Sequence, residues 1–90
     1  MSKFRPGDSV RIRSDPNHPT DQHRIYDFPE KIRWVGESIV PRSFIGKVPG
    51  GSIGIVVEVK SEQCKVLFFG GEVFGWVSEN QLEQLEIHLV

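Results

Sequence analysis

Two histidines and two aspartates share one polar run near the start of the chain, and their types could hold a metal ion. The run contains Asp15, His18, Asp21 and His23. Imidazole nitrogens and carboxylate oxygens are common metal ligands. Their spacing matches no zinc-binding pattern, and the single cysteine, Cys64, falls on an expected core face. We therefore expect neither a metal site nor a cofactor.

The same residues form no recognisable catalytic pair. A catalytic His18 or His23 would need a nucleophile or an acid within hydrogen-bond reach in a cleft. Cys64 fits a small core residue better than a nucleophile. The glycine-rich stretch 49–52 is typical of a turn and not of a phosphate-binding loop. The sequence therefore predicts a non-enzymatic protein.

Apolar residues flank the glycine pair at 70–71 and form the main candidate binding surface. A two-residue turn at these glycines pairs Phe68 with Val73 and Lys65 with Trp76. Because neighbouring strand residues point to opposite faces, this register separates a core face from an outer face. The core face holds Cys64, Val66, Phe68, Val73 and Val77. The outer face holds Lys65, Leu67, Phe69, Phe74 and Trp76. We expect Trp76 to be the central anchor of a protein-binding patch.

A second apolar face must be covered or used. Residues 14–50 carry enough apolar side chains to fold over it, with Trp34 or Phe28 as a lid. They could equally form one wall of a groove beside it. In that groove Trp34 would supply apolar contact, and Arg33 or Arg42 would orient the partner. The sequence leaves both arrangements open.

Basic residues near the start of the chain suggest a different partner. They are Lys3, Arg5, Arg11 and Arg13. Nucleic-acid binding needs a concentrated basic face for the phosphates. The net charge is −1, and residues 49–90 carry two lysines against six glutamates. We keep these four residues as an alternative nucleic-acid site. Otherwise they are a solvated strand edge that discourages aggregation.

The chain of 90 residues is short enough for one domain, and its nine glycines and six prolines favour a turn-rich all-β fold. No apolar run approaches the ~20 residues that cross a bilayer. The first residues lack the apolar core of a secretion signal. A lone cysteine excludes an intrachain disulfide and favours a reducing compartment. We expect a cytoplasmic protein without a membrane partner.

Strand patterns fix most of the expected elements. Residues 9–13 alternate, with Val10 and Ile12 on one face. Residues 14–50 hold five prolines, which excludes a useful helix, and short strands are expected at 32–35 and 39–40. The strongest strand is 53–60. We expect its core face to hold Ile53, Ile55, Val57 and Val59. Gly54 indicates a bend or a close backbone approach.

This order of strand, long loop, three-strand meander, single turn and short final strand resembles an SH3-like small β-barrel. Residues 75–82, GWVSENQL, are similar to the G-x-(I/F)-P-(S/A)-N-Y-V run of SH3 domains, with Ser78 in place of the proline and Gln81 in place of the tyrosine. The resemblance implies that Val77 and Leu82 are core and that Trp76 and Asn80 are outward or semi-exposed. The ALYDY motif and the tandem tryptophans are absent.

The opening F-x-x-G-D-x-V-R-I also resembles the first strand of KOW-type domains and of the barrel domain of nitrile hydratase β-chains. We predict one SH3-like barrel over 1–90, with a long ordered loop at about 14–50. The predicted function is non-enzymatic binding of another protein, as a small accessory subunit of a larger assembly. The alternatives are a KOW-like nucleic-acid-associated barrel and a non-catalytic barrel subunit of an enzyme complex.

Overall fold

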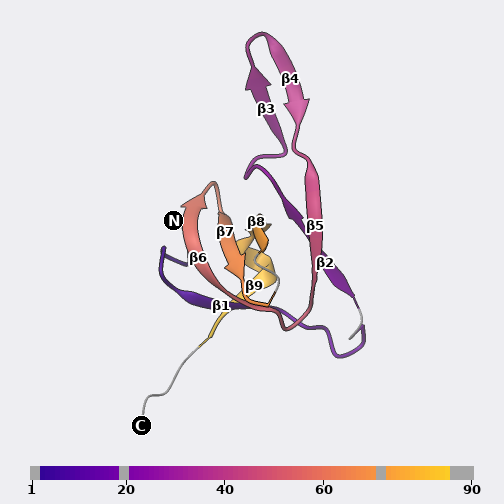
Figure 1. The fold of residues 1–90 in the computed structure, drawn as a ribbon, viewed down its shortest axis with the longest axis vertical. Helices are drawn as coiled ribbons and strands as arrows, with labels where there is room; N and C mark the ends of the chain where they lie inside the picture. Colours follow the sequence, from indigo (N-terminus) through magenta and orange to yellow (C-terminus); the bar gives the residue numbers. More distant parts are fainter. Residues whose placement is uncertain (1–2, 19–20, 71–72, 86–90) are drawn as a thin grey trace.

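The computed structural model describes residues 3–18, 21–70 and 73–85, and these form strands joined by turns, with one 3₁₀ turn. The elements are β1 (Ser9–Ile12), β2 (Gln22–Tyr26), β3 (Ile32–Val35), β4 (Ser38–Pro41), β5 (Phe44–Pro49), β6 (Ile53–Lys60), β7 (Gln63–Phe68), β8 (Val73–Ser78), η1 (Glu79–Gln81) and β9 (Leu82–Gln84). Seven strands form one antiparallel sheet in the order β5-β2-β8-β7-β6-β1-β9. Strands β3 and β4 form a separate hairpin that extends away from it (Figure 1). The all-β expectation is confirmed.

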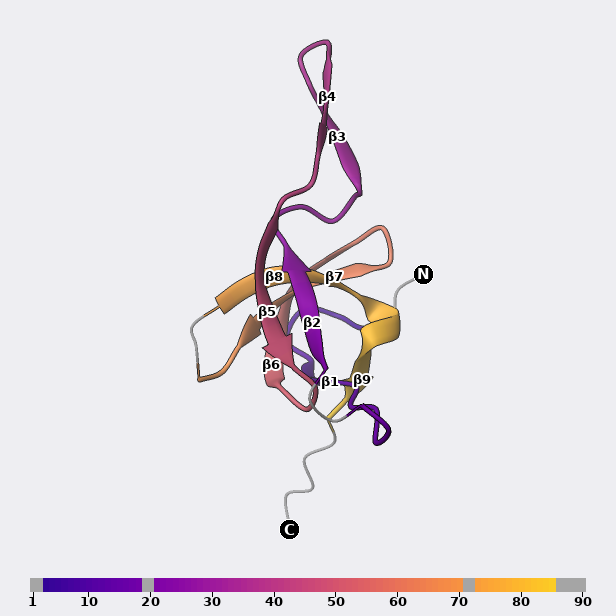
Figure 2. The same cartoon turned by 90° about the vertical axis from the view of Figure 1, so that its right-hand side faces the viewer.

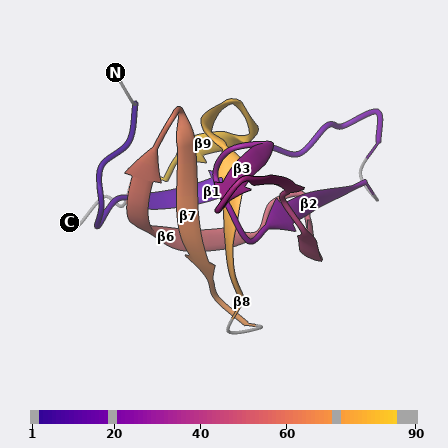
Figure 3. The ribbon, with the colours of Figure 1, turned by 90° about the horizontal axis from the view of Figure 1, so that it is seen from above.

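The large sheet is open, whereas the sequence predicts a closed small barrel. Its two edges are β5 and β9. Strand β2 occupies the free side of β8, and β9 has only three residues, so the described strands do not close the ring. The sheet is nevertheless strongly curled, because the long β6 bends as it passes from β1 to β7 (Figure 3).

The β7–β8 hairpin has the register that the glycine pair predicts. Phe68 lies opposite Val73, and Lys65 lies opposite Trp76. Gly70 has a φ of 89°, the left-handed value that glycine adopts without a steric penalty. Residues 71 and 72, which include the second glycine of the predicted turn, lie outside the described part of the chain.

The core fills the concave side of the curled sheet with side chains from every strand of its central part. It comprises Phe4, Val10, Ile12, Ile25, Val48, Val56, Cys64, Val66, Phe68, Val77 and Leu82, with Val59 and Val73 packed against it. The core face expected for the hairpin is therefore confirmed. The burial expected for Val77 and Leu82 is confirmed as well, and Asn80 is exposed as the resemblance implies.

Strand β6 differs from the prediction because it contains a β-bulge. Val56 lies opposite Val66, but the next pair is Glu58 with Lys65, so Val57 is an extra residue. A bulge shifts the inward–outward alternation by one residue. Even-numbered residues therefore point inward before Val57, and odd-numbered residues point inward after it.

The predicted core face of β6 is consequently wrong for three of its four residues. Ile53 and Val57 are 40% and 39% exposed, and Ile55 is half-buried. Val56 is completely buried instead, and Gly54 is buried where β6 lies between β1 and β7. Only Val59, which follows the bulge, packs against the core as expected.

The described parts of the excursion, residues 14–18 and 21–50, contain more sheet than the prolines suggest. The short strands expected at 32–35 and 39–40 are β3 and β4. Strands β2 and β5 were not expected, and they extend the main sheet beside β8. Ile25 of β2 is fully buried, and a Cβ added to Gly75 would lie only 2.7 Å from the Ile25 Cβ. Gly75 thus lets β2 approach β8 closely.

The tight β6–β7 turn holds two residues in a costly backbone conformation. Ser61 and Glu62 have φ values of 52° and 59°, where asparagine and glycine are favoured. Replacing Glu62 by glycine should raise the free energy of unfolding by roughly 0.5–1 kcal/mol. Urea denaturation measures the change. Glu58→Gly on the neighbouring strand is the matched control and should be destabilising, so equal effects of the two variants would contradict the explanation.

Candidate functional site

The outer face of the β7–β8 hairpin is the surface that the sequence predicts as a binding patch. Phe69 and Phe74 are 57% and 48% exposed, and Leu67 is half-buried. The Lys65 ammonium lies 5.8 Å from the centre of the Phe74 ring. These four residues are gathered on one face as expected.

Trp76 is the exception, and its expected role as an exposed anchor is wrong. Only 6% of its surface is accessible, although it lies on the outer side, outside the core cluster. Tyr26 of β2 pairs with Trp76 on one side, and Lys65 of β7 pairs with it on the other. The sequence predicts no strand on the side of β8 away from β7, whereas β2 lies there in the structure.

The excursion does not fold over the outer face as a lid. Trp34, one of the two proposed lid residues, is 67% exposed on β3. Phe28, the other, is half-buried, with the charged ends of Arg33 and Lys60 at 5.4 and 5.7 Å from its ring centre. The excursion instead adds β2 and β5 to the side of the sheet. The excursion also forms one wall of a groove, but no residue of the outer face of the β7–β8 hairpin lines it, so this is not the groove that the sequence predicts.

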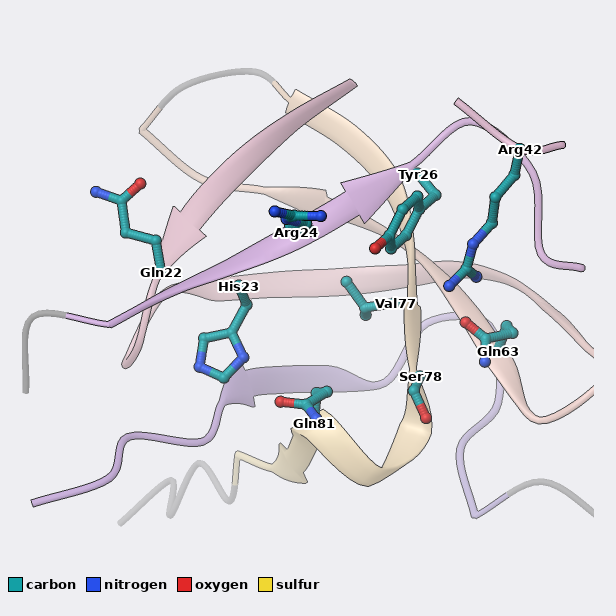
Figure 4. Close-up of a pocket in the computed structure, with 9 residues that line it drawn as sticks. All are labelled: Gln22, His23, Arg24, Tyr26, Arg42, Gln63, Val77, Ser78 and Gln81. Carbon is teal, nitrogen blue, oxygen red and sulfur yellow. The ribbon is translucent and has the colours of Figure 1, made fainter. Parts of the chain in front are cut away.

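This groove runs between β2 and the segment from β8 to η1 and has a volume of about 350 Å³ (Figure 4). Its lining residues are Gln22, His23, Arg24, Tyr26, Arg42, Gln63, Val77, Ser78 and Gln81. Figure 4 shows His23 from β2 and Gln81 from η1 extending into the space between the two segments. Arg42, expected to orient a partner, does line the groove, while Arg33, Lys65, Leu67, Phe69, Phe74 and Trp76 do not.

Cationic and aromatic side chains are interleaved along this groove and beside it. The guanidinium carbon of Arg42 lies 3.7 Å from the centre of the Tyr26 ring. On the neighbouring β5, the ring of Phe44 has Arg24 at 5.4 Å and Lys47 at 5.8 Å. Each contact is within the range of a cation–π interaction. Arg24 and Arg42 are thus held close to the rings of Phe44 and Tyr26, and these contacts leave their positive charges in place.

The polar run that could have held a metal ion lines a second hollow of about 370 Å³, which shares His23 and Gln81 with the groove. Asp15, His18 and Asp21 lie in it, together with Arg13. The Asp15 carboxylate accepts a hydrogen bond of 2.8 Å from the Asn17 backbone N–H, as in a turn. Among the described residues, no group of three or more histidine, cysteine, aspartate or glutamate side chains could hold a metal ion.

The β3–β4 hairpin, which we call the arm, carries an exposed apolar face. The register places Trp34 opposite Ile39 and Ile32 opposite Pro41. These four residues share one face of the arm, because paired residues of an antiparallel hairpin point to the same side. Trp34, Ile39 and Ile32 are between half and two-thirds exposed. Arg33 points to the other face. The arm stands clear of the main sheet in a second view (Figure 2).

The basic residues near the N-terminus do not form a free cationic face. Arg11 makes an ion pair of 2.7 Å with Glu83, and the Arg13 side chain donates a hydrogen bond of 3.3 Å to the Leu82 carbonyl. Lys3 and Arg5 are exposed. Strand β1 lies between β6 and β9, so the expectation of a solvated strand edge is wrong for this strand. The reason is that β9 pairs with β1.

No protein-family model, curated protein or solved structure matches the chain. Within the described residues, no helix has the length and apolarity to cross a membrane. Cys64, the only cysteine of the sequence, is completely buried in the core. The arm carries the most exposed tryptophan of the described residues, and the groove contains Arg42, a predicted contact residue.

Proposed function

We propose that this protein is a non-enzymatic module that binds another protein, with the arm as its main contact. The exposed apolar face of Ile32, Trp34, Ile39 and Pro41 is the observation that carries the proposal. A two-stranded hairpin standing alone is at best marginally stable in water. Exposed apolar patches mark interaction sites, and tryptophan is enriched among the residues that dominate binding energy. Packing the arm against a partner would cover this face.

The strand arrangement supports an SH3-like module with an enlarged loop. Strands β8, β7, β6, β1 and β9 are neighbours in that order, and η1 leads directly from β8 to β9. Residues 14–50 then correspond to the long loop after the first strand, with the arm at its far end. A small module with one projecting contact suits an accessory subunit of a larger assembly. The single cysteine of the sequence, Cys64, leaves no intrachain disulfide to form, which is in keeping with a cytoplasmic setting.

An affinity-capture experiment tests the proposal. The variant Trp34→Thr/Ile39→Thr removes two large exposed members of the apolar face and places a β-branched residue at both strand positions. The tagged protein is incubated with native lysate, and bound proteins are quantified by mass spectrometry. We expect a specific partner to be lost by at least ~10-fold from the arm variant, as removal of a central aromatic contact predicts.

The matched control is Ile53→Thr/Phe69→Thr, which removes two large exposed apolar residues from the outer face of the main sheet. This control should capture the same partner as the unmodified protein. Equal capture by the arm variant would contradict the role of the arm. If the partner proves to be a catalytic subunit, the protein is a non-catalytic subunit of an enzyme complex, which is a special case of the same proposal.

A further inference from the structure

The groove between β2 and η1 has a lining whose charge differs from that of the chain as a whole. The chain has 12 acidic and 11 basic residues, yet no carboxylate lines the groove, while Arg24, Arg42 and His23 do. Among the described residues, neither arginine is part of an ion pair, since Arg11–Glu83 is the ion pair that this part of the chain contains. The positive charge of the groove is therefore not neutralised from within.

The Arg42 guanidinium is held in place without losing its hydrogen-bonding capacity. It lies 3.7 Å from the Tyr26 ring centre, so the ring restricts the long side chain through contact with its face. A guanidinium has five N–H donors around its edge, and stacking on a ring leaves the edge available. Two of these donors match the two oxygens of a carboxylate. Gln63, Ser78 and Gln81 add neutral hydrogen-bonding groups along the same groove.

We propose that the groove binds an extended acidic segment of the partner protein, with a glutamate or aspartate side chain at Arg42. This inference rests on the proposed function, since it takes the partner to be a protein. The adjoining hollow, beyond His23 and Gln81, contains the two carboxylates of Asp15 and Asp21 and one arginine, Arg13. The acidic part of the segment therefore occupies the Tyr26–Arg42 end, and the part beyond His23 carries neutral or basic residues. The charge distribution gives the segment a direction.

Two observations favour an acidic polypeptide over a nucleic acid. A phosphate backbone is bound by a row of unneutralised cations, whereas the groove supplies two arginines and the adjoining hollow places Arg13 beside the carboxylates of Asp15 and Asp21. Of the basic residues in and just after β1 that could extend such a row, Arg11 is neutralised by Glu83, and the Arg13 side chain is held by a hydrogen bond to the Leu82 carbonyl. A single carboxylate bound by Arg42, which stacks on Tyr26, matches this small number of positive charges better than a phosphate backbone does.

Fluorescence anisotropy with a labelled, capped tetraglutamate peptide tests the inference. Titrations use the full chain at low ionic strength, where surface charge interactions are least screened. We expect saturable binding that Arg42→Gln weakens by about 10-fold, the loss expected for one hydrogen-bonded charge pair. Arg42→Lys keeps the charge without the planar fork and should also weaken binding, by a smaller factor. Tetraglutamine should bind at least ~10-fold more weakly than tetraglutamate.

Arg5→Gln is the matched control, because it removes one exposed positive charge away from the groove. It should change tetraglutamate affinity by less than about twofold, since screened surface charges contribute little. An equal loss in Arg5→Gln and Arg42→Gln would show general charge attraction and overturn the inference. Absence of saturable binding would overturn it too, as would tighter binding of a labelled oligothymidylate that depends on Arg42. Thermal denaturation establishes that each variant is folded.

The arm variant separates this inference from the proposed function. Trp34→Thr/Ile39→Thr leaves every groove residue unchanged and should bind tetraglutamate like the unmodified protein. Loss of tetraglutamate binding in Arg42→Gln with normal partner capture by the arm variant supports the groove and contradicts the arm. Partner capture that depends on the arm, without any tetraglutamate binding, supports the proposed function and overturns the acidic segment.

Discussion

Replacing Gly54 by alanine should lower the free energy of unfolding by about 3 kcal/mol, the upper part of the range for an overpacked core. A Cβ at this position would lie 2.5 Å from the Leu67 carbonyl oxygen and 2.6 Å from the Val66 Cγ1. The first of these neighbours is backbone of the adjacent strand. It cannot withdraw unless the pairing of β6 with β7 is distorted at the point where β6 bends.

Gly46→Ala is the matched control for this substitution. A Cβ there would meet the Ile25 side chain at 3.5 Å, an ordinary van der Waals contact. Gly46 is also a strand residue with a negative φ, so both variants have the same change in backbone freedom. Urea denaturation of the two variants should give a loss at Gly54 that exceeds the change at Gly46 by at least about 2 kcal/mol. Equal midpoints would show that β6 and β7 are further apart than the structure has them.

Trp76→Ala should destabilise the protein by roughly 3–5 kcal/mol, whereas Trp34→Ala should change its stability by less than about 1 kcal/mol. The two tryptophans differ in burial, at 6% and 67% exposed. Removing Trp76 leaves a cavity between Lys65 of β7 and Tyr26 of β2. Removing Trp34 takes away a side chain that already contacts water over most of its surface.

Thermal denaturation followed by circular dichroism measures both changes, and one-dimensional NMR of the indole N–H protons shows which tryptophan is protected from solvent. The comparison needs no further control, because each variant serves as the other's reference. A Trp76→Ala protein that melts like the unmodified one would restore Trp76 as an exposed binding residue. It would also remove β2 from its place beside β8.

The local parts of the fold could be predicted from the sequence, because short-range patterns determine them. The glycine pair in the sequence predicts the β7–β8 register that the structure has, and the alternation in 64–68 identifies the buried face. Ser78 begins η1, where its hydroxyl accepts a hydrogen bond of 3.4 Å from the Asn80 backbone N–H. Each of these features depends on residues within a few positions of one another.

Long-range pairing could not be predicted in the same way. No local pattern in Gln22–Tyr26 indicates that it pairs with β8. The pairing depends on the absence of a side chain at Gly75, which makes room for Ile25 and lies 50 positions away from it in the sequence. The bulge at Val57 has no local signature either, because Ile53, Ile55, Val57 and Val59 alternate without interruption. The missed β2–β8 pairing and the missed bulge are both errors in the pairing of residues between neighbouring strands.

The sequence predicts a groove beside the outer face of the β7–β8 hairpin, whereas the structure has one between β2 and the segment from β8 to η1. Arg42 was expected in a groove, but Tyr26, Arg24, His23 and Gln81 were not. They reach the groove through the pairing of β2 with β8, so the failure to predict β2 is also the failure to predict them. An aromatic residue that precedes an arginine by 16 positions gives no signal of the Tyr26–Arg42 contact before the pairing is known.

The close packing of Ile25 against Gly75 affects the rate and the affinity with which the groove can bind a polypeptide segment. Ile25 is inaccessible to solvent and Val48 nearly so, which ties both β2 and β5 to the same core as β8. One wall of the groove cannot swing outward unless that core opens. An incoming segment would therefore meet a preformed surface, and the entropy lost on binding would come mainly from the segment itself.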